Sequence, residues 1–233
     1  MRTIVSAACR TAALSLILLS GPVAARPVVV ELFTSQSCSS CPPAEALLGR
    51  LAEEGGEVLP LAYHVTYWNH LDWRDTYSLP AATERQHDYA ARLGDAVYTP
   101  QAVIDGRVGL VGSREDAVRA AIAAARGSAG EEVPVTLSGR TSLTVRLGAG
   151  RGAGRVILVG FDPRHDTAVP RGENAGRTLV QFNVVRSVAE IGDWTGAERE
   201  WTIPWPAGGA AAVLVQDAGG RVIGAASARG GGA

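Results

Sequence analysis

The stretch VVVELFTSQSCSSCPP, residues 28–43, decides the expected fold of the first half of the chain. Its first six residues are mostly apolar and β-branched, which is typical of a buried strand. A short polar loop containing Cys38 and Cys41 follows, and residues 44–54 then show the apolar spacing of a helix. A C-x-x-C pair placed between a strand and a helix is the usual context of a disulfide that forms and breaks during function.

Cys38 and Cys41 are the candidate catalytic residues. The free backbone N–H groups and the positive dipole end of a helix stabilise a thiolate and lower the pKa of the leading cysteine. We therefore expect Cys38 to be the exposed nucleophile and Cys41 to be the buried thiol that resolves a mixed disulfide. Two other interpretations stay open: an inert structural disulfide, and half of a metal site. A zinc site normally needs two further Cys or His ligands, and the sequence has no second C-x-x-C.

The N-terminal 25 residues have the pattern of a cleaved signal peptide. Arg2 and Arg10 supply basic charge, residues 11–19 form an apolar run too short for a permanent membrane span, and small residues precede Arg26. We expect the mature chain to start at or near Arg26 and to be periplasmic or secreted, with an uncleaved anchor as the alternative. Cleavage also removes Cys9, so the C-x-x-C pair then holds the only cysteines, which suits a disulfide-permissive compartment.

The charge of the chain argues against nucleic-acid binding. The formal net charge is −1 at pH 7, and it becomes −3 once Arg2 and Arg10 leave with the signal peptide. Nucleic-acid binding depends on clustered basic charge, which the sequence lacks. No apolar run after residue 25 is long enough for a membrane helix. The expected partners are therefore protein or small-molecule thiols and disulfides, with no cofactor and no membrane contact after cleavage.

A second buried strand is expected at residues 58–63, so that strand, helix and strand form a right-handed parallel crossover. Both strands then end at the same edge of the sheet, where open α/β sheets bind ligands. The chain that leaves the second strand carries two histidines and three aromatic residues, namely His64, Tyr67, Trp68, His70 and Trp73. They form either a substrate platform with an imidazole near the thiols, or a set of core-capping aromatics and surface histidines.

Two further helices and a hairpin complete the first half. Residues 83–93 and 114–126 have helical spacing, with capping residues at or before their starts. Between them, residues 97–112 read as two short strands around an Asp-Gly turn. Thr99 and Pro100 stand at the head of the first of these strands, where proline is tolerated because it has no N–H to donate to the ladder.

This order of elements, with a C-x-x-C after the first strand and Thr-Pro before the hairpin, resembles the thioredoxin fold. In that superfamily a proline matching Pro100 is cis and packs beside the redox cysteines, where it exposes backbone groups that pair with a substrate segment. The chain is also similar to the domain of unknown function 1223 family, secreted bacterial proteins with a thioredoxin-like core. The segments that carry this similarity are residues 31–36, 38–43, 64–68, 98–101 and 172–177.

The resemblance implies roles for several residues outside the cysteine pair. Thioredoxins bury an acid under the second cysteine to move protons, and Glu31 is the nearest match, with His64 as a second candidate. Strand alternation would equally turn Glu31 to solvent. Substrate binding is implied for Thr99, Tyr67 and Trp68.

Two features depart from ordinary thioredoxins. Ser37 stands where thioredoxins carry a tryptophan before the first cysteine, so partner recognition must differ. Pro42 and Pro43 follow the second cysteine directly. Because proline removes backbone donors, these two residues favour a helix that starts near Cys41 or Pro42 rather than at Cys38.

A Gly/Ser stretch at residues 127–130 marks the expected boundary of a second domain, residues 131–229. Seven strand-like runs separated by turns follow: 133–137, 142–147, 155–161, 179–186, 199–203, 211–216 and 222–226. Such a pattern is typical of a β-sandwich or an open barrel. The polar loop of residues 165–178 either connects two strands as a long hairpin, holds an acidic ligand, or docks against the redox face.

The sequence thus predicts a thioredoxin-like α/β domain over residues 26–127, with a mixed sheet and flanking helices, followed by an all-β sandwich-like domain. The favoured function is an exported thiol–disulfide oxidoreductase, and its redox direction stays open. One alternative is a copper- or zinc-binding or metal-delivery protein that uses Cys38 and Cys41 with His64 or His70. The other is a non-catalytic binding module that the disulfide only staples.

Overall fold

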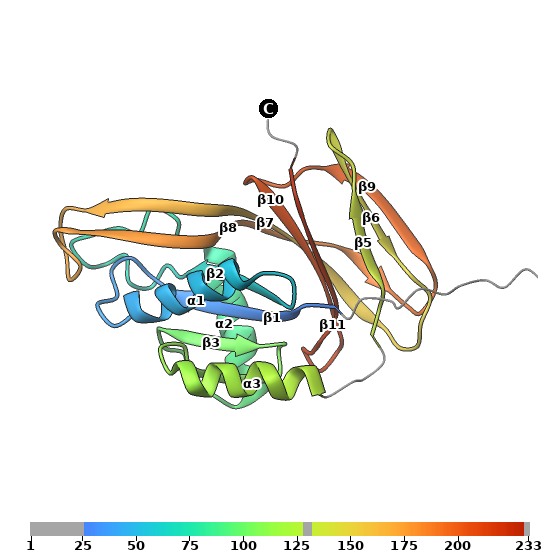
Figure 1. Cartoon of the computed structure of the whole chain (residues 1–233), viewed down its shortest axis with the longest axis horizontal. Helices are drawn as coiled ribbons and strands as arrows, with labels where there is room; N and C mark the ends of the chain where they lie inside the picture. Colours follow the sequence, from blue (N-terminus) through green and yellow to red (C-terminus); the bar gives the residue numbers. More distant parts are fainter. Residues whose placement is uncertain (1–25, 128–131, 231–233) are drawn as a thin grey trace, which may run out of the picture.

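The computed structural model describes residues 26–127 and 132–230 (Figure 1). The predicted signal peptide and most of the predicted Gly/Ser boundary lie outside these residues. The described chain contains helices α1 (Pro42–Glu54), α2 (Pro80–Leu93) and α3 (Glu115–Gly127). Within the two described ranges, no helix is long and apolar enough to span a bilayer.

The strands form a large mixed sheet and a small one. The large sheet consists of β1 (Val28–Thr34), β2 (Val58–His64), β3 (Gln101–Ile104), β4 (Val108–Val111), β7 (Gly154–Val169), β8 (Arg177–Trp194), β10 (Ala210–Gln216) and β11 (Val222–Arg229). Their order across the sheet is β11-β10-β7-β8-β2-β1-β3-β4. The small sheet consists of β5 (Val135–Ser138), β6 (Ser142–Leu147) and β9 (Arg199–Pro204).

β1 lies inside the large sheet and is buried on both faces, as its apolar run predicted. Its residues alternate between two cores. Val30 and Leu32 pack with α1 and α3, whereas Val29 and Phe33 pack with α2 and with strands of the second half. β1 pairs in parallel with β2 and antiparallel with β3, so the predicted crossover is confirmed and the sheet is mixed.

The helix starts follow from the positions of proline. α1 begins at Pro42, directly after Cys41, because a proline in the first turn removes no hydrogen bond that the helix would otherwise make. α2 begins at Pro80, three residues before the predicted start. Thr83 therefore lies inside the helix, and its Oγ1 accepts a hydrogen bond from the N–H of Thr66 at 2.9 Å rather than capping α2.

The second half of the chain extends the sheet of the first half. β8 pairs in parallel with β2 at Ala62 and Val184, and β7, β10 and β11 continue the sheet beyond β8. The small sheet packs on this extension in a core that includes the fully buried Trp194. The predicted strands are present and two sheets stack as in a sandwich, but one sheet runs through both halves of a single mixed α/β fold.

β7 and β8 form a hairpin much longer than the strands predicted for this region, because they continue through the polar loop of residues 165–178. Figure 1 shows the outer part of this hairpin, the hairpin arm (residues 162–169 and 177–183), reaching past α1 toward the loop that follows β1. A Cβ at Gly49 would lie 2.7 Å from the Phe182 ring, so glycine allows the arm to approach the helix. We call residues 170–176, which join the two strands, the hairpin tip.

Candidate functional site

A disulfide joins Cys38 and Cys41 in the loop between β1 and α1, with the two Cα atoms 5.4 Å apart. Cys41 stands directly before the helix, and its carbonyl oxygen accepts hydrogen bonds from the N–H groups of Ala44 (2.9 Å) and Glu45 (3.1 Å). The two prolines of the first turn carry no N–H, so this helix end offers fewer donors to a thiolate than an ordinary N-terminus does.

Both cysteines are buried. Cys38 is 1% exposed and Cys41 is 0% exposed, whereas the two serines between them are exposed. The prediction that Cys38 is exposed is therefore wrong for the disulfide-bonded form, and its role as the nucleophile stays a prediction. The prediction failed because it considered only contacts from the first half of the chain. Residues of the second half also pack on the loop of residues 35–41, which we call the cysteine loop.

The hairpin tip lies on the cysteine loop. The buried Asn174 donates from Nδ2 to the carbonyl oxygens of Gln36 (2.9 Å) and Cys38 (3.0 Å). Beside it, Oε2 of Glu173 accepts a hydrogen bond from the N–H of Ser39 at 3.1 Å. Of the three interpretations of the polar loop, the structure thus supports two at once, a long hairpin and docking against the cysteines.

His64 is fully buried at the end of β2, where it belongs to a polar cluster. Its Nδ1 lies 2.7 Å from Oδ2 of Asp75, and the same oxygen accepts a hydrogen bond from the N–H of Gln36 at 2.7 Å. Burial alone would lower the pKa of His64, but the carboxylate of Asp75 and, after it, Glu45 raise that pKa. Burial likewise opposes ionisation of Asp75, yet His64 and backbone N–H groups lower its pKa. Each partner therefore favours the charged form of the other.

Glu45 is a buried acid on α1 that the sequence-based predictions missed. Its Oε1 accepts a hydrogen bond from Oγ1 of Thr34 at 2.8 Å, and its N–H is bonded to the carbonyl oxygen of Cys41. Burial raises the pKa of Glu45, and the nearby His64 opposes this shift. The available signal was helical spacing, because Glu45 lies one turn before the buried Leu48, on the face that packs against the sheet.

Two glutamines connect the hairpin arm to this cluster. Nε2 of Gln181 lies 3.3 Å from Nε2 of His64, and Oε1 of Gln181 accepts hydrogen bonds from Nε2 of Gln36 (3.1 Å) and Oγ1 of Thr167 (3.1 Å). Trp73 donates from Nε1 to Oε1 of Gln36 at 3.0 Å. Gln36 and Gln181 are 145 positions apart, so no local sequence pattern predicts their contact.

Glu31, the predicted proton-transfer acid, lies on the face of β1 that points away from α1. It is fully buried, so the alternative that it faces solvent is wrong. Its carboxylate binds Nε and Nη2 of Arg85 on α2, with Nη2 at 2.9 Å, and it accepts a hydrogen bond from the hydroxyl of Tyr89. Strand alternation explains this placement, since Glu31 shares its face with Phe33. Its partner is thus a guanidinium, and Glu45 is the acid on the cysteine side.

The Thr99–Pro100 peptide bond is cis, as the resemblance implied. Gln101 pairs with Phe33 near the end of β1, so Pro100 lies at the sheet edge from which the cysteine loop departs. Pro100 is buried, and Trp68 donates from Nε1 to Oγ1 of Thr99 at 2.8 Å. The Tyr67 ring lies beside that of Trp68, with the centroids 6.3 Å apart, so the structure brings together the three residues with an implied role in substrate binding.

Tyr67 and His70 of the aromatic segment differ in burial. Tyr67 donates to Oε1 of Gln86 on α2 at 3.2 Å and packs with Trp68 against the core on the α2 face, as the core-capping interpretation predicted. His70 is exposed and donates from Nδ1 to the carbonyl oxygen of Tyr67 at 2.7 Å.

The alternative metal site is not assembled. Residues 26–127 and 132–230 contain no cluster of three or more His, Cys, Asp or Glu side chains that fits a metal ion. The sulfur atoms of Cys38 and Cys41 are bonded to each other. His64 faces Asp75, and His70 lies at the surface beside Tyr67.

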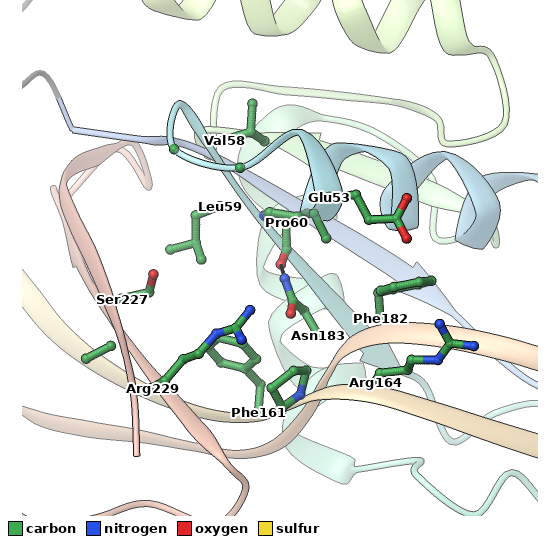
Figure 2. Close-up of a pocket in the computed structure, with 15 residues that line it drawn as sticks. Glu53, Val58, Leu59, Pro60, Phe161, Arg164, Phe182, Asn183, Ser227 and Arg229 are labelled. Carbon is green, nitrogen blue, oxygen red and sulfur yellow. Dashed lines mark hydrogen bonds between the residues drawn. The ribbon is translucent and has the colours of Figure 1, made fainter. Parts of the chain in front are cut away.

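A separate cleft of about 470 Å³ lies at the opposite end of β2 from His64. Figure 2 shows that it is bordered by Glu53 at the end of α1, by Pro60 on β2, and by residues of β7, β8 and β11. Asn183 points across it and donates to the carbonyl oxygen of Pro60 at 2.8 Å. None of the predicted site residues is among those that line this cleft.

Comparisons with known proteins identify the family. The family described as "Protein of unknown function (DUF1223)" matches residues 29–216. A crystal structure of a protein from Agrobacterium tumefaciens is 33% identical, covers 88% of this chain and 95% of its own, and superimposes with a TM-score of 0.78. HBP35 of Porphyromonas gingivalis shares the fold at 13% identity, with a TM-score of 0.58 and coverage of 88% of this chain and 75% of its own. No curated protein matches the chain. The similarity to the domain of unknown function 1223 family seen in the sequence is confirmed, and the chain belongs to this family of proteins of unknown function.

Proposed function

We propose that this protein is an exported thiol–disulfide oxidoreductase that acts through Cys38 and Cys41 on protein or small-molecule thiols. The observation that carries the proposal is the position of the disulfide. It closes the loop between β1 and the N-terminus of α1, at the sheet edge where the cis Pro100 also lies. In this proposal, residues 26–127 have a thioredoxin-like arrangement, which accounts for the position of the disulfide at this sheet edge. Residues 131–229 supply the hairpin that covers the disulfide.

The proposed reaction transfers two electrons and two protons. In the oxidising direction, a substrate thiolate attacks Sγ of Cys38, the Cys38–Cys41 bond breaks, and Cys41 leaves as a thiolate that takes up a proton. A second substrate thiolate then attacks the substrate sulfur of the mixed disulfide. This step forms the substrate disulfide and releases Cys38, which takes up the second proton. The same steps in reverse reduce a substrate disulfide.

Glu45 and His64 are the groups that support proton movement at Cys41. The backbone of Glu45 contacts Cys41, and burial raises the pKa of its carboxyl. A carboxyl of raised pKa donates a proton readily to a departing thiolate and takes it back in the reverse reaction. His64, held by Asp75, stabilises the carboxylate that remains on Glu45.

A second candidate function is a non-catalytic binding protein in which the disulfide staples the loop. The observation that favours it is the burial of both cysteines, since a thiolate attacks only a sulfur that it can reach. The two candidates differ in one measurable property, because a staple does not exchange with dithiols under native conditions.

Incubation of the oxidised protein with excess reduced dithiol peptide tests the proposal. An oxidoreductase is expected to gain two hydrogen atoms as the peptide loses two, and mass spectrometry follows both masses over time. The double variant Cys38→Ser/Cys41→Ser is the matched control and should leave the peptide unchanged. If the native wild-type protein does not react until denaturant unfolds it, the disulfide is a staple.

Replacing Glu45 by glutamine is expected to remove a pH-dependent part of the stability. The folded-state pKa of Glu45 lies above the ordinary 4.5, so between these values the folded protein holds a proton that the unfolded chain has released. The stabilisation is therefore complete below about pH 4.5 and is lost as the pH rises through the folded-state pKa. The slope is at most about 1.4 kcal/mol per pH unit.

Urea unfolding between about pH 4.5 and pH 6 measures this effect. The ordinary pKa of a histidine is 6.5 and that of folded His64 lies higher, so His64 stays largely protonated in both states over this range. The free energy of unfolding of the wild type, minus that of Glu45→Gln, should fall with rising pH. Glu53→Gln, which changes an exposed acid of the same helix, is the matched control. A flat or rising difference for Glu45→Gln would contradict the raised pKa.

A further inference from the structure

We propose that the hairpin tip is a gate on the Cys38–Cys41 disulfide, which must swing away from the cysteine loop before a thiol reaches Cys38. The gate regulates the site of the proposed oxidoreductase, and its physiological purpose rests on that function. The physical effect of the gate on the disulfide does not rest on the proposed function, because a simple chemical reductant measures access to Cys38.

The closed position is specified by hydrogen bonds from side chains of the tip to the backbone of the cysteine loop. The amide of Asn174 donates to two carbonyl oxygens, those of Gln36 and Cys38, and the carboxylate of Glu173 accepts from Ser39. Asn174 is only 1% exposed although it lies in a loop that joins two strands. Glu173 and Asn174 thus bind the backbone of the cysteine loop before, at and after Cys38.

The arm that carries the tip is anchored beside the site. Gln181 on β8 and Thr167 on β7, which are diagonal neighbours in the ladder of the arm, form a hydrogen-bonded group with Gln36. At the tip, Gly172 has a φ of +81° and lies against Trp73, where an added Cβ would be 3.1 Å from the Cβ of Trp73. The ladder between β7 and β8 ends at Val169 and Arg177, so the tip is able to move while the arm stays in place.

The contact of the tip with the loop is weak enough to open. Within residues 170–176, Asn174 is the only buried side chain, and no apolar side chain of the tip belongs to a core. The closed state therefore depends on a few hydrogen bonds, each of which contributes modestly in water. Segments held in this way open locally, without unfolding of the protein.

Opening the gate exposes backbone groups that a polypeptide partner can bond. When the tip leaves, the carbonyl oxygen of Gln36 and the N–H of Ser39 lose these hydrogen bonds. The carbonyl oxygen of Cys38 loses the bond from Asn174 and keeps the one from the N–H of Cys41. An extended peptide presents N–H and C=O groups at suitable spacing to replace them. The tip therefore occupies the position that an extended substrate segment takes next to Cys38.

The rate at which dithiothreitol reduces the native oxidised protein tests the gate. We expect Asn174→Ala to be reduced about tenfold faster than the wild type, which corresponds to a barrier lowered by about 1.4 kcal/mol. Glu173→Ala should be reduced several-fold faster, and Glu173→Gln, which keeps an acceptor for Ser39, should stay near the wild-type rate. Arg171→Ala, which removes an exposed side chain of the same tip, is the matched control and should not change the rate.

Unchanged rates in both Asn174→Ala and Glu173→Ala would overturn the gate. Glu173 is exposed, so its variants should fold even where loss of the buried Asn174 disturbs the protein. Low concentrations of urea provide a second readout: reduction through the gate is nearly independent of urea, whereas reduction through global unfolding accelerates with the equilibrium m-value. A strong urea dependence in the wild type would also overturn the gate. Failure of the proposed function gives a different result from failure of the gate. In that case the variants are still reduced faster by dithiothreitol, but the protein does not exchange with dithiol peptides.

Discussion

Replacing Arg85 by methionine is expected to lower the free energy of unfolding by about 3–5 kcal/mol. Glu31 is 0% exposed, and Arg85 is the cation that binds both of its oxygens. Removing the guanidinium leaves a carboxylate inside the core with only the hydroxyl of Tyr89 and nearby dipoles to stabilise it. An unpaired buried charge costs far more than the ion pair contributes, because desolvation is no longer offset.

Chemical denaturation at pH 7 measures this loss, and two controls make it specific. The double variant Glu31→Leu/Arg85→Met removes both charges and should recover at least half of the lost stability. Arg119→Met breaks exposed ion pairs with Glu54 and Glu115, whose closest N–O distances are 2.7 and 2.9 Å, and should cost much less than Arg85→Met because water screens exposed charges. A cost for Arg85→Met as small as that for Arg119→Met would show that the buried pair does not hold β1 and α2 together.

Replacing Cys41 by serine is expected to abolish turnover and to trap a mixed disulfide on Cys38. This mixed disulfide forms when the Cys38 thiolate attacks a disulfide-bonded substrate peptide and one peptide sulfur leaves as a thiolate. Cys41 caps the first turn of α1, where its carbonyl oxygen binds two N–H groups and its side chain is completely buried. Cys38 lies in the loop, next to exposed serines and beneath the hairpin tip. Once the tip moves, Cys38 is the sulfur that a partner reaches, and without Cys41 the mixed disulfide has no internal thiol to resolve it.

The reciprocal variant Cys38→Ser is the matched control. It keeps one thiol, but the buried Cys41 should attack the same disulfide-bonded peptide, and so form the mixed disulfide, at least tenfold more slowly. Peptide mapping of the trapped species locates the bond. Faster trapping on Cys41 would reverse the two roles, and trapping on neither would leave the disulfide as a staple.

The local part of the fold could be predicted from sequence because short-range patterns determine it. The apolar run of β1, the helical spacing of α1 and the Asp-Gly turn between β3 and β4 each reflect residues close together in the chain. The prolines also carried positional information, since Pro42 marked the start of α1 and Pro100 the cis bond at the sheet edge.

The covered site could not be predicted because it depends on contacts between distant parts of the chain. Asn174 meets Gln36 across 138 positions, and Gln181 meets it across 145. A polar loop of residues 165–178 is compatible with several partners, and only the continuation of β7 and β8 through it selects the cysteine loop. Glu31 illustrates a smaller ambiguity. Alternation places it on the same face of β1 as Phe33, but only the contacts with α2, such as that with Arg85, show that this face is buried.

Equilibration of the wild-type protein with redox buffers of defined potential is the most direct test of the proposed function. The fraction of reduced Cys38 and Cys41, counted by alkylation and mass spectrometry, gives the reduction potential of the pair. An oxidoreductase is expected to have a potential between about −270 and −120 mV, the range of proteins that exchange disulfides. A potential below about −300 mV, as in structural disulfides, would contradict the account.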